Sequence, residues 1–223
     1  MAKQFVLIGL GQFGISVAET LSSLGQDVLA VDKDELVIQE IADKVTHAVQ
    51  MDATDEHALR TLGVRNFDVA VVTVGSNIQA SIMITLLLRE AGVKYIICKG
   101  QSELHKKVLL KIGADRVVLP EKDMGIRVAH NLVSPKLVDF LEISNDYQII
   151  EIKSPKEWIG KSLKELNIRG KYGITVVAIR MGNKELNISP NADVIIPENS
   201  LIVAVGSTEA FDKLTSKLLS DDE

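Results

Sequence analysis

The sequence predicts an α/β protein with a Rossmann-type doubly wound parallel sheet, then a crossover helix and a small α+β C-terminal domain. Through the first 120 residues of the 223-residue chain, apolar strand-like runs alternate with segments of helical spacing. A three-glycine turn follows the first of these runs, and from Tyr147 shorter strands separated by turns replace the alternation. We therefore divide the chain into residues 1–120, 121–142 and 143–223.

The three-glycine turn lies between the apolar run 5–8, typical of a buried strand, and a segment of helical spacing that reaches residue 24. In such a turn Gly9 allows the tight bend, Gly11 lets a pyrophosphate approach the backbone, and Gly14 lets the helix pack closely on its strand. The free amides of the helix N-terminus would face the phosphates. The alternative is that the glycines serve only helix–strand packing.

An acidic residue follows the second predicted strand, 28–31, at a distance typical of nucleotide-binding turns. Asp32 comes eighteen residues after Gly14. A carboxylate there accepts hydrogen bonds from both ribose hydroxyls of an adenosine and repels a 2′-phosphate. Together with the glycine turn it predicts a bound adenine nucleotide; the alternative role for Asp32 is to cap a turn.

The alternation of strand and helix continues to residue 119. The run 68–74 is β-branched and almost entirely apolar, as expected for a strand covered on both faces. Thr54 or Asp55 is suited to cap the third helix, and Gly63 to end it. The remaining predicted strands are 46–50, 95–98 and 116–119, and the predicted helices are 34–42, 54–62, 78–91 and 103–112.

Further candidate ligand contacts follow the third, fourth and fifth predicted strands, at the sheet edge where such folds bind ligands. Asp52 and Ala53 serve either the nucleotide base or ribose, or only the chemistry of a turn. Gly75 and Ser76 open a helix and are candidates for phosphate or ribose contact. Lys99 either faces a phosphate or is an ordinary exposed lysine.

Beyond the last strand of the first domain, the amphipathic stretch 124–141 predicts a crossover helix that pairs two chains, with a break at Ser134–Pro135. The C-terminal domain is expected to be a compact α+β module. Its predicted strands are 149–152, 174–179, 186–188, 194–196 and 201–205, its predicted helices are 162–166 and 208–219, and Gly182–Asn183 is a predicted turn.

Composition excludes several classes of partner. The formal net charge is −5, the pI is near 5.5 and the basic residues are scattered, so no nucleic acid or anionic membrane surface is expected as a partner. Cys98, the single cysteine, lies in an apolar strand and is expected to be an inert buried thiol, which fits a reducing cytoplasm. We expect neither a signal peptide nor a membrane span, so a role at a membrane requires recruitment by a partner.

The sequence offers little catalytic machinery. Its four histidines, His47, His57, His105 and His130, do not have the spacing of metal ligands. It contains no P-loop, nucleophile elbow or paired-cysteine motif, and the C-terminal domain has no histidine to act as an acid or base in hydride transfer. The nucleotide is therefore expected to be sensed rather than consumed. The alternative function is a small NAD(H)-dependent oxidoreductase.

Five sequence motifs carry a resemblance to a known family. The chain resembles the cytoplasmic regulatory subunits of Ktr/Trk potassium uptake systems, the RCK family with TrkA-N and TrkA-C domains, and is most similar to the Ktr branch. The resemblance covers nearly the whole length. The motifs are residues 9–14 (GLGQFG), 77–81 (NIQAS), 111–116 (KIGADR), 120–124 (PEKDM) and 169–174 (RGKYGI).

The resemblance implies homodimers joined through the crossover helix and assembled into a homo-octameric ring at the inner face of the cell membrane. The ring would dock on an integral-membrane potassium transporter, with ATP activating and ADP inactivating, and with NAD or NADH as other ligands. Glu121 would help hold a divalent cation such as Mg²⁺ or Ca²⁺ near the nucleotide phosphates; without the resemblance it is a solvated acid at a helix start. The implied nucleotide contacts are Gly9, Gly11, Gln12, Phe13, Gly14, Asp32, Lys33, Asp34, Asp52, Ala53, Val74, Gly75, Ser76, Lys99, Gly100, Gln101, His105 and Glu121.

Three positions depart from what the resemblance leads us to expect. Gln12 stands where Ktr-type relatives usually have an arginine that reaches the terminal phosphate in the neighbouring subunit, so we expect weaker discrimination between ATP and ADP. The C-terminal domain resembles a module that binds cyclic di-AMP across a dimer interface, where Asn167 and Thr175 replace the usual aspartate and asparagine. The alternative is a plain dimerisation module. The implied contacts are Asn167, Ile168, Arg169, Ile174, Thr175 and Pro190.

Overall fold

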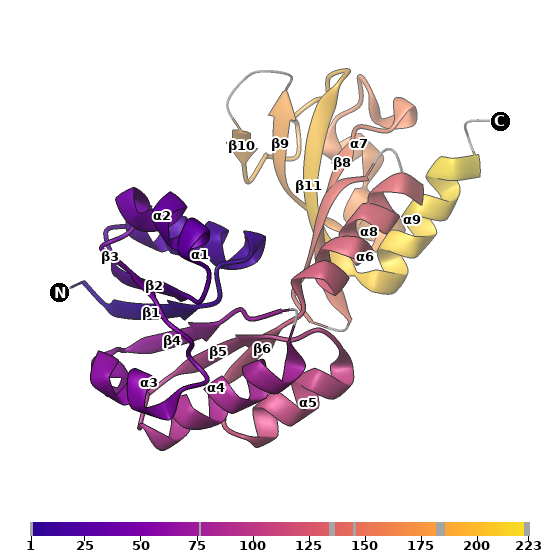
Figure 1. Ribbon diagram of the computed structural model, residues 1–223. Helices are drawn as coiled ribbons and strands as arrows, with labels where there is room; N and C mark the ends of the chain where they lie inside the picture. Colours follow the sequence, from indigo (N-terminus) through magenta and orange to yellow (C-terminus); the bar gives the residue numbers. More distant parts are fainter. Residues whose placement is uncertain (1, 76, 134–136, 145, 182–185, 221–223) are drawn as a thin grey trace. The chain divides into compact units, whose positions relative to one another are not determined.

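A computed structural model describes residues 2–75, 77–133, 137–144, 146–181 and 186–220 (Figure 1). The chain separates into two compact units, Met1–Lys122 and Asp123–Glu223. Each unit has its own hydrophobic core and its own sheet.

The first unit is built on a six-stranded sheet in the order β3-β2-β1-β4-β5-β6. All of its strand pairs are parallel, which confirms the predicted doubly wound fold. The strand order reverses between β1 and β4, and ligands of such sheets bind at the carboxyl ends of the strands on either side of that point. The strands are β1 (Gln4–Ile8), β2 (Asp27–Asp32), β3 (His47–Gln50), β4 (Val69–Val72), β5 (Ile96–Lys99) and β6 (Arg116–Val118).

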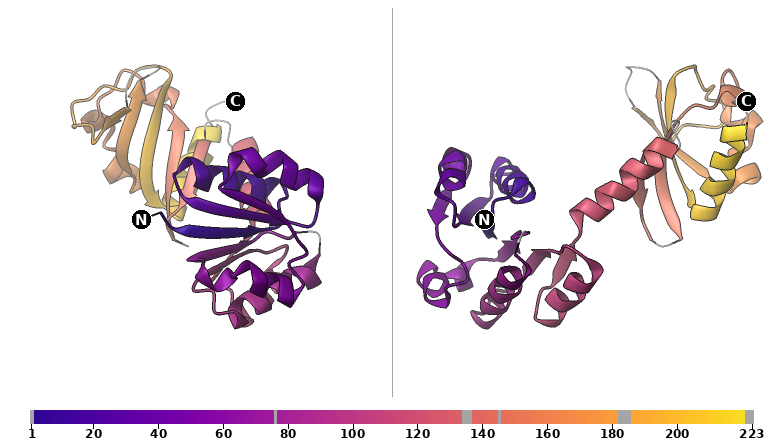
Figure 2. Two further views of the ribbon diagram at one scale, coloured as in Figure 1. Left: turned by 60° about the vertical axis from the view of Figure 1, so that its left-hand side comes forward. Right: turned by 45° about the vertical axis from the view of Figure 1, so that its right-hand side comes forward.

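Helices cover both faces of this sheet. In Figures 1 and 2, α1 and α2 lie on one face and α3, α4 and α5 on the other. Side chains alternate along β1, so Val6 and Ile8 join the core under α3 to α5, whereas Leu7 joins the core under α1 and α2. The helices are α1 (Gln12–Ser23), α2 (Glu35–Ile41), α3 (Glu56–Leu62), α4 (Ile78–Glu90) and α5 (Glu103–Lys111), with short 3₁₀ turns at Ala42–Lys44 and Val64–Asn66.

The second unit contains a five-stranded antiparallel sheet in the order β10-β9-β11-β8-β7. Its core gathers Trp158, Ile179, Ile202 and Phe211. The strands are β7 (Leu137–Glu142), β8 (Tyr147–Lys153), β9 (Thr175–Met181), β10 (Leu186–Ile188) and β11 (Ser200–Ser207), and the helices are η3 (Lys156–Trp158, a 3₁₀ turn), α7 (Leu163–Leu166), α8 (Ile168–Tyr172) and α9 (Thr208–Ser220).

The prediction of a crossover helix through residues 121–142 is wrong in its second half. Helix α6 spans Pro120–Val133, and β7 (Leu137–Glu142) is a strand that pairs antiparallel with β8. Pro135 has no amide donor and disfavours a helical conformation at the residue before it, so a helix is not expected to continue past this point. The predicted break at Ser134–Pro135 itself lies outside the described residues, as does the predicted turn at Gly182–Asn183.

Two smaller predictions for the second unit also differ from the structure. Residues 194–196 form only an isolated bridge, between Ser162 and Ile195, instead of a strand. Helix α8 was not predicted, because it is only five residues long and contains Gly170, a poor helix former.

Arg89, in the last turn of α4, ties this helix to the edge of the sheet. Its Nε donates to the Gly113 carbonyl oxygen at 2.9 Å, and one terminal nitrogen lies 2.6 Å from the Asp115 carboxylate. Asp115 in turn accepts the amide of Ile96 at 2.7 Å. The arginine therefore satisfies backbone and side-chain acceptors that anchor the start of β5 and β6.

We expect Arg89→Met to lower the free energy of unfolding by about 2 kcal/mol, because it leaves these acceptors without their donor but keeps the aliphatic stem. Urea denaturation followed by circular dichroism measures the effect. The control is Arg60→Met, which should cost less than about 0.5 kcal/mol, since among the described residues Arg60 forms an exposed ion pair with Glu56 alone. Equal losses in the two variants would contradict the anchoring role.

Candidate functional site

The glycine turn between β1 and α1 has a different physical requirement at each glycine. Gly9 adopts a φ of +93°, and its amide donates to the Val31 carbonyl oxygen at 2.9 Å. A β-carbon on Gly14 would collide with the Gly9 carbonyl oxygen and lie 2.6 Å from Thr73 Oγ1. A β-carbon on Gly11 would meet nothing within 4 Å. Only Gly11 therefore leaves open space beside the turn.

The N-terminus of α1 borders this open space. Gly11 is the N-cap residue, and neither a capping side chain nor an acidic residue of the first turn satisfies the amides there. Such amides carry partial positive charge and bind anions. Gln12, the first residue of the helix, is exposed.

Asp32, the last residue of β2, holds the glycine turn. Its Oδ2 accepts the Leu10 amide at 2.6 Å, and its Oδ1 accepts the Asp34 amide at 3.0 Å. Each carboxylate oxygen has more than one lone pair, so both can also accept from a ligand hydroxyl. Lys33 and Asp34 are exposed, and Asp34 caps α2 through the Leu36 amide at 3.0 Å.

At the end of β3, Asp52 and Ala53 have different surroundings. Asp52 Oδ1 accepts the Thr54 hydroxyl at 2.7 Å and the Thr54 amide at 2.9 Å, and these hydrogen bonds lower the pKa of Asp52. Ala53 is buried in the core beneath the sheet edge. The turn chemistry that the sequence left open is present, with Asp55 rather than Thr54 as the cap of α3.

Lys99, the last residue of β5, lies near residues from three other segments at the same edge. Its side chain is only 16% exposed, and its Nζ lies 6.0 Å from the centroid of the Phe13 ring at the start of α1. A β-carbon on Gly75, after β4, would lie 3.6 Å from the same nitrogen. The ammonium also forms an ion pair with Glu121 in the first turn of α6, and the hydrogen bond from Lys99 lowers the pKa of Glu121.

Two residues in and just after the β5–α5 loop, Gly100 and His105, are buried. A β-carbon on Gly100 would lie 3.0 Å from Val117 Cγ1 in β6 and 2.8 Å from Cδ2 of Leu119 just after it, so close packing at this edge explains the glycine. The Gln101 amide donates to His105 Nδ1 at 3.3 Å. His105 is buried, burial lowers its pKa, and its Nε2 has no hydrogen-bond partner within the described part of the chain. The lowered pKa favours the neutral form of the ring.

The structure brings most of the predicted nucleotide contacts to one sheet edge. Val74 and Gly75 are half-buried there, while Ser76 lies outside the described residues. Thr73 is a residue that the sequence reasoning missed: its hydroxyl donates to the Gly9 carbonyl oxygen and fastens the glycine turn to β4. The signal was present, because Thr73 is the only polar residue among 69–74.

The predicted contacts in the second unit divide into core and surface. Ile168 and Ile174 are buried in its core and are not open to a ligand. Asn167, in a left-handed conformation at φ 45° between α7 and α8, is exposed, as are Arg169 and Thr175. Pro190 is half-buried.

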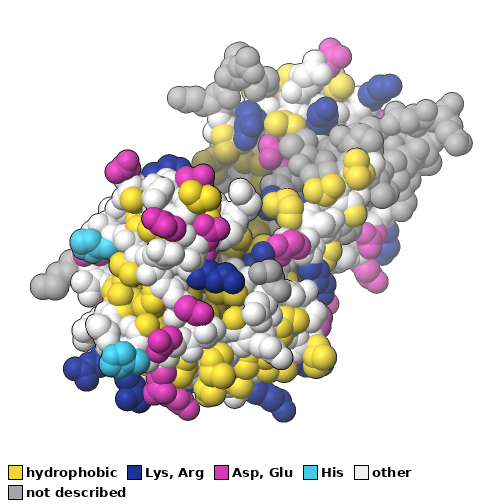
Figure 3. Space-filling view, in the orientation of Figure 1, with side chains coloured by type: hydrophobic (Ala, Val, Ile, Leu, Met, Phe, Trp, Pro, Cys, Tyr) yellow, Lys and Arg dark blue, Asp and Glu magenta, His cyan; other side chains and the backbone are white. Residues whose placement is uncertain are grey.

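Other features limit what these units can do chemically. Burial raises the pKa of the Cys98 thiol to about 11, which makes it unreactive as a nucleophile. Within the described residues, no group of three or more His, Cys, Asp or Glu side chains could hold a metal ion, and no helix is long and apolar enough to cross a membrane. Acidic and basic side chains are interspersed over the visible face of the first unit (Figure 3).

Comparison with known proteins places the chain in a family. Residues 5–120 match the TrkA-N domain, and residues 147–219 match the TrkA-C domain. The chain is 45% identical over 219 residues to Ktr system potassium uptake protein C of Bacillus subtilis (strain 168), covering 98% of this chain and 99% of that protein. The chain belongs to the TrkA-N/TrkA-C family. This membership confirms the resemblance seen in the sequence.

Two further similar proteins agree with this placement. Ktr system potassium uptake protein A of the same organism is 43% identical over 204 residues, covering 92% of this chain and 91% of that protein. A solved GsuK channel superposes with a TM-score of 0.68 at 19% identity, over 96% of this chain and 39% of that one. That likeness shows the fold alone, over less than half of the channel's length. The close relatives are potassium uptake proteins and not enzymes, so the oxidoreductase alternative is set aside.

Proposed function

We propose that this chain is a nucleotide-sensing regulatory subunit of a Ktr-type potassium uptake system, and that its first unit binds an adenine nucleotide. The observation that carries the nucleotide site is the open space at Gly11 beside the unsatisfied amides of α1. Asp32, at the end of the neighbouring strand, supplies acceptors for ribose hydroxyls. The identity to Ktr proteins supports the link to potassium uptake.

The nucleotide pair that we propose is ATP and ADP, with NAD and NADH as the competing pair. Lys99 would face a phosphate, because its ammonium lies beside Phe13 and Gly75 at the edge that holds the glycine turn. Glu121 is a single carboxylate, 70% exposed, which fits a Mg²⁺ or Ca²⁺ ion held mainly by nucleotide phosphates and water. The bound cation would neutralise phosphate charge at this edge.

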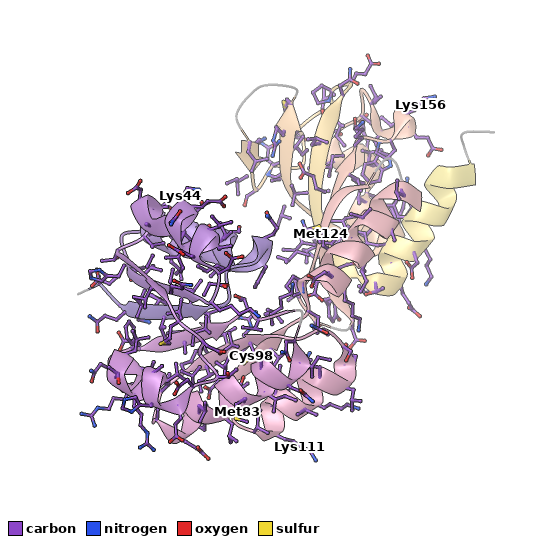
Figure 4. All side chains as sticks on the ribbon, viewed as in Figure 1. Lys44, Met83, Cys98, Lys111, Met124 and Lys156 are labelled. Atoms are coloured by element: carbon purple, nitrogen blue, oxygen red, sulfur yellow. The ribbon has the colours of Figure 1, made fainter. Side chains whose placement is uncertain are left out.

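We further propose that α6 pairs two chains and that four such dimers form an octameric ring. Met124, Ile126 and Val128 are 53%, 39% and 49% exposed on this helix, and Leu132 is 76% exposed, which is unusual for a helix surrounded by water. Figure 4 labels Met124 on α6. The ring would lie in the cytoplasm at the inner face of the membrane, docked on an integral-membrane potassium transporter.

The test is binding of ATP, ADP, NADH and adenosine to the purified chain by calorimetry, with particle mass recorded for each ligand. We expect ATP and ADP to bind an octamer. A preference for NADH in a dimer or monomer, or no binding of any of the four, would overturn the proposal.

Gln12 gives a prediction about discrimination between nucleotides. An arginine at this position would supply a forked, charge-assisted contact to a terminal phosphate that the neutral amide cannot supply. We expect Gln12→Arg to raise the affinity for ATP about tenfold more than the affinity for ADP. Calorimetry with both nucleotides measures this ratio, and Gln12→Met is the control for side-chain length. An unchanged ratio in the arginine variant would show that residue 12 does not reach the terminal phosphate.

A second ligand is proposed for the C-terminal unit. Arg169 is exposed on α8 and forms no ion pair with the described residues, so its guanidinium is available to a phosphate of cyclic di-AMP. Calorimetry should detect binding to the wild type and a loss in Arg169→Ala, whereas Lys171→Ala, on the same helix, should bind normally. An absence of heat in the wild type would leave the unit as a dimerisation module.

A further inference from the structure

Lys99 and Glu121 form an ion pair whose two partners are very unequally exposed. The lysine side chain is 16% exposed and the glutamate side chain is 70% exposed. The Lys99 ammonium is confined further by the Phe13 ring, whose centroid lies 6.0 Å away, and by the β4–α4 loop at Gly75. The Lys99 ammonium is therefore held in place, whereas the Glu121 carboxylate can move into solvent.

A confined ammonium needs an anionic partner, because removing a charge from water is costly unless it is paired. In the structure that partner is Glu121. Releasing Glu121 into water costs little free energy, since most of this side chain is already hydrated. The Lys99 ammonium stays at the site because its side chain is mostly buried. A second anion that reaches the site can therefore take over the lysine by simple exchange.

The site for such an anion is defined by the same residues. Phe13 belongs to the first turn of α1, whose free amides are suited to phosphate, and its ring centroid lies 6.0 Å from the Lys99 ammonium. We propose that Glu121 is an internal competitor for the phosphate position, and that a nucleotide phosphate binds by displacing it from Lys99. This inference rests on the nucleotide site proposed above.

The exchange also couples the ligand to α6. Glu121 is the second residue of this helix, which begins at Pro120. With phosphate absent, the ion pair ties the first turn of α6 to the end of β5; with phosphate bound, the tie is released and the carboxylate is free for a cation. The nucleotide would thus alter the attachment of the helix that we propose to pair two chains.

The experiment compares ADP with adenosine, which has no phosphate, by calorimetry on the full-length chain in EDTA. Glu121→Gln removes the competing charge, so ADP should bind roughly fivefold more tightly, and the affinity for adenosine should stay unchanged. Lys99→Gln should lower the affinity for ADP about tenfold and leave the affinity for adenosine unchanged. The matched control is Glu103→Gln, which removes an acid from the 2.6 Å pair with Lys122 on the neighbouring helix and should alter neither affinity.

The double variant Lys99→Gln/Glu121→Gln separates exchange from plain repulsion. If Glu121 acts only by competing for Lys99, its replacement has no effect on ADP affinity once Lys99 is gone. A gain that persists without Lys99 would show direct repulsion between Glu121 and the phosphate, and would overturn the exchange. Unchanged or weaker ADP binding in Glu121→Gln would overturn it as well. If the wild type binds neither ligand, the proposed nucleotide site itself fails.

Discussion

Gly14→Ala is expected to destabilise the first unit by about 3 kcal/mol or more. The added β-carbon would collide with the Gly9 carbonyl oxygen and lie 2.6 Å from Thr73 Oγ1. Neither neighbour can move freely, because Gly9 is held by its bond to Val31 and Thr73 lies in the buried end of the β4 segment. Relief requires α1 to move away from β1, which would lose packing across that face of the sheet.

Urea denaturation and thermal melting measure this loss. Thr73→Ser tests how much the packing of Thr73 against this turn contributes to stability. It keeps the hydroxyl that donates to the Gly9 carbonyl oxygen and removes only a methyl group. We expect it to cost about 1 kcal/mol. A Gly14→Ala variant with the stability of the wild type would show that the helix can shift at no cost and that close packing does not explain this glycine.

The first unit was largely predictable because its signals are local in the sequence. The β-branched run at 69–72 forms β4, Asp55 caps α3 and Gly63 ends it in a left-handed conformation. Residues 137–142 were mispredicted as helix because their pairing partner, β8, is what makes them a strand. Period and propensity do not report such a pairing.

The candidate site, too, has features that could be predicted from the sequence and features that could not. The distinct roles of Gly9 and Gly14 follow from their spacing, and Asp32 follows from its distance to the turn. The bond from Thr73 to Gly9 spans 64 residues of sequence, and the Lys99–Glu121 pair spans 22. Each joins the ends of different elements, so only the assembled sheet reveals them. The role of Asp32 in holding the Leu10 amide also required the fold.

Gly11→Ala should separate binding from folding more sharply than any other change to this turn. A β-carbon at Gly11 meets nothing within 4 Å, and the backbone there has an ordinary φ of −70°. The variant is therefore expected to fold with wild-type stability. The methyl group would occupy the space through which a phosphate approaches the amides of α1, so the affinity for ADP should fall about tenfold to a hundredfold.

Calorimetry with ADP and adenosine, paired with urea denaturation, measures both halves of the Gly11→Ala prediction. Adenosine should bind the variant as it binds the wild type, because it has no phosphate to meet the methyl group. Gly125→Ala is the matched control, since a β-carbon there also meets nothing within 4 Å but lies on α6. A Gly11→Ala protein that binds ADP normally would place the phosphates away from the α1 N-terminus. That result would remove the principal support for the nucleotide site, whereas a loss shared equally by adenosine would indicate a general disturbance of the sheet edge.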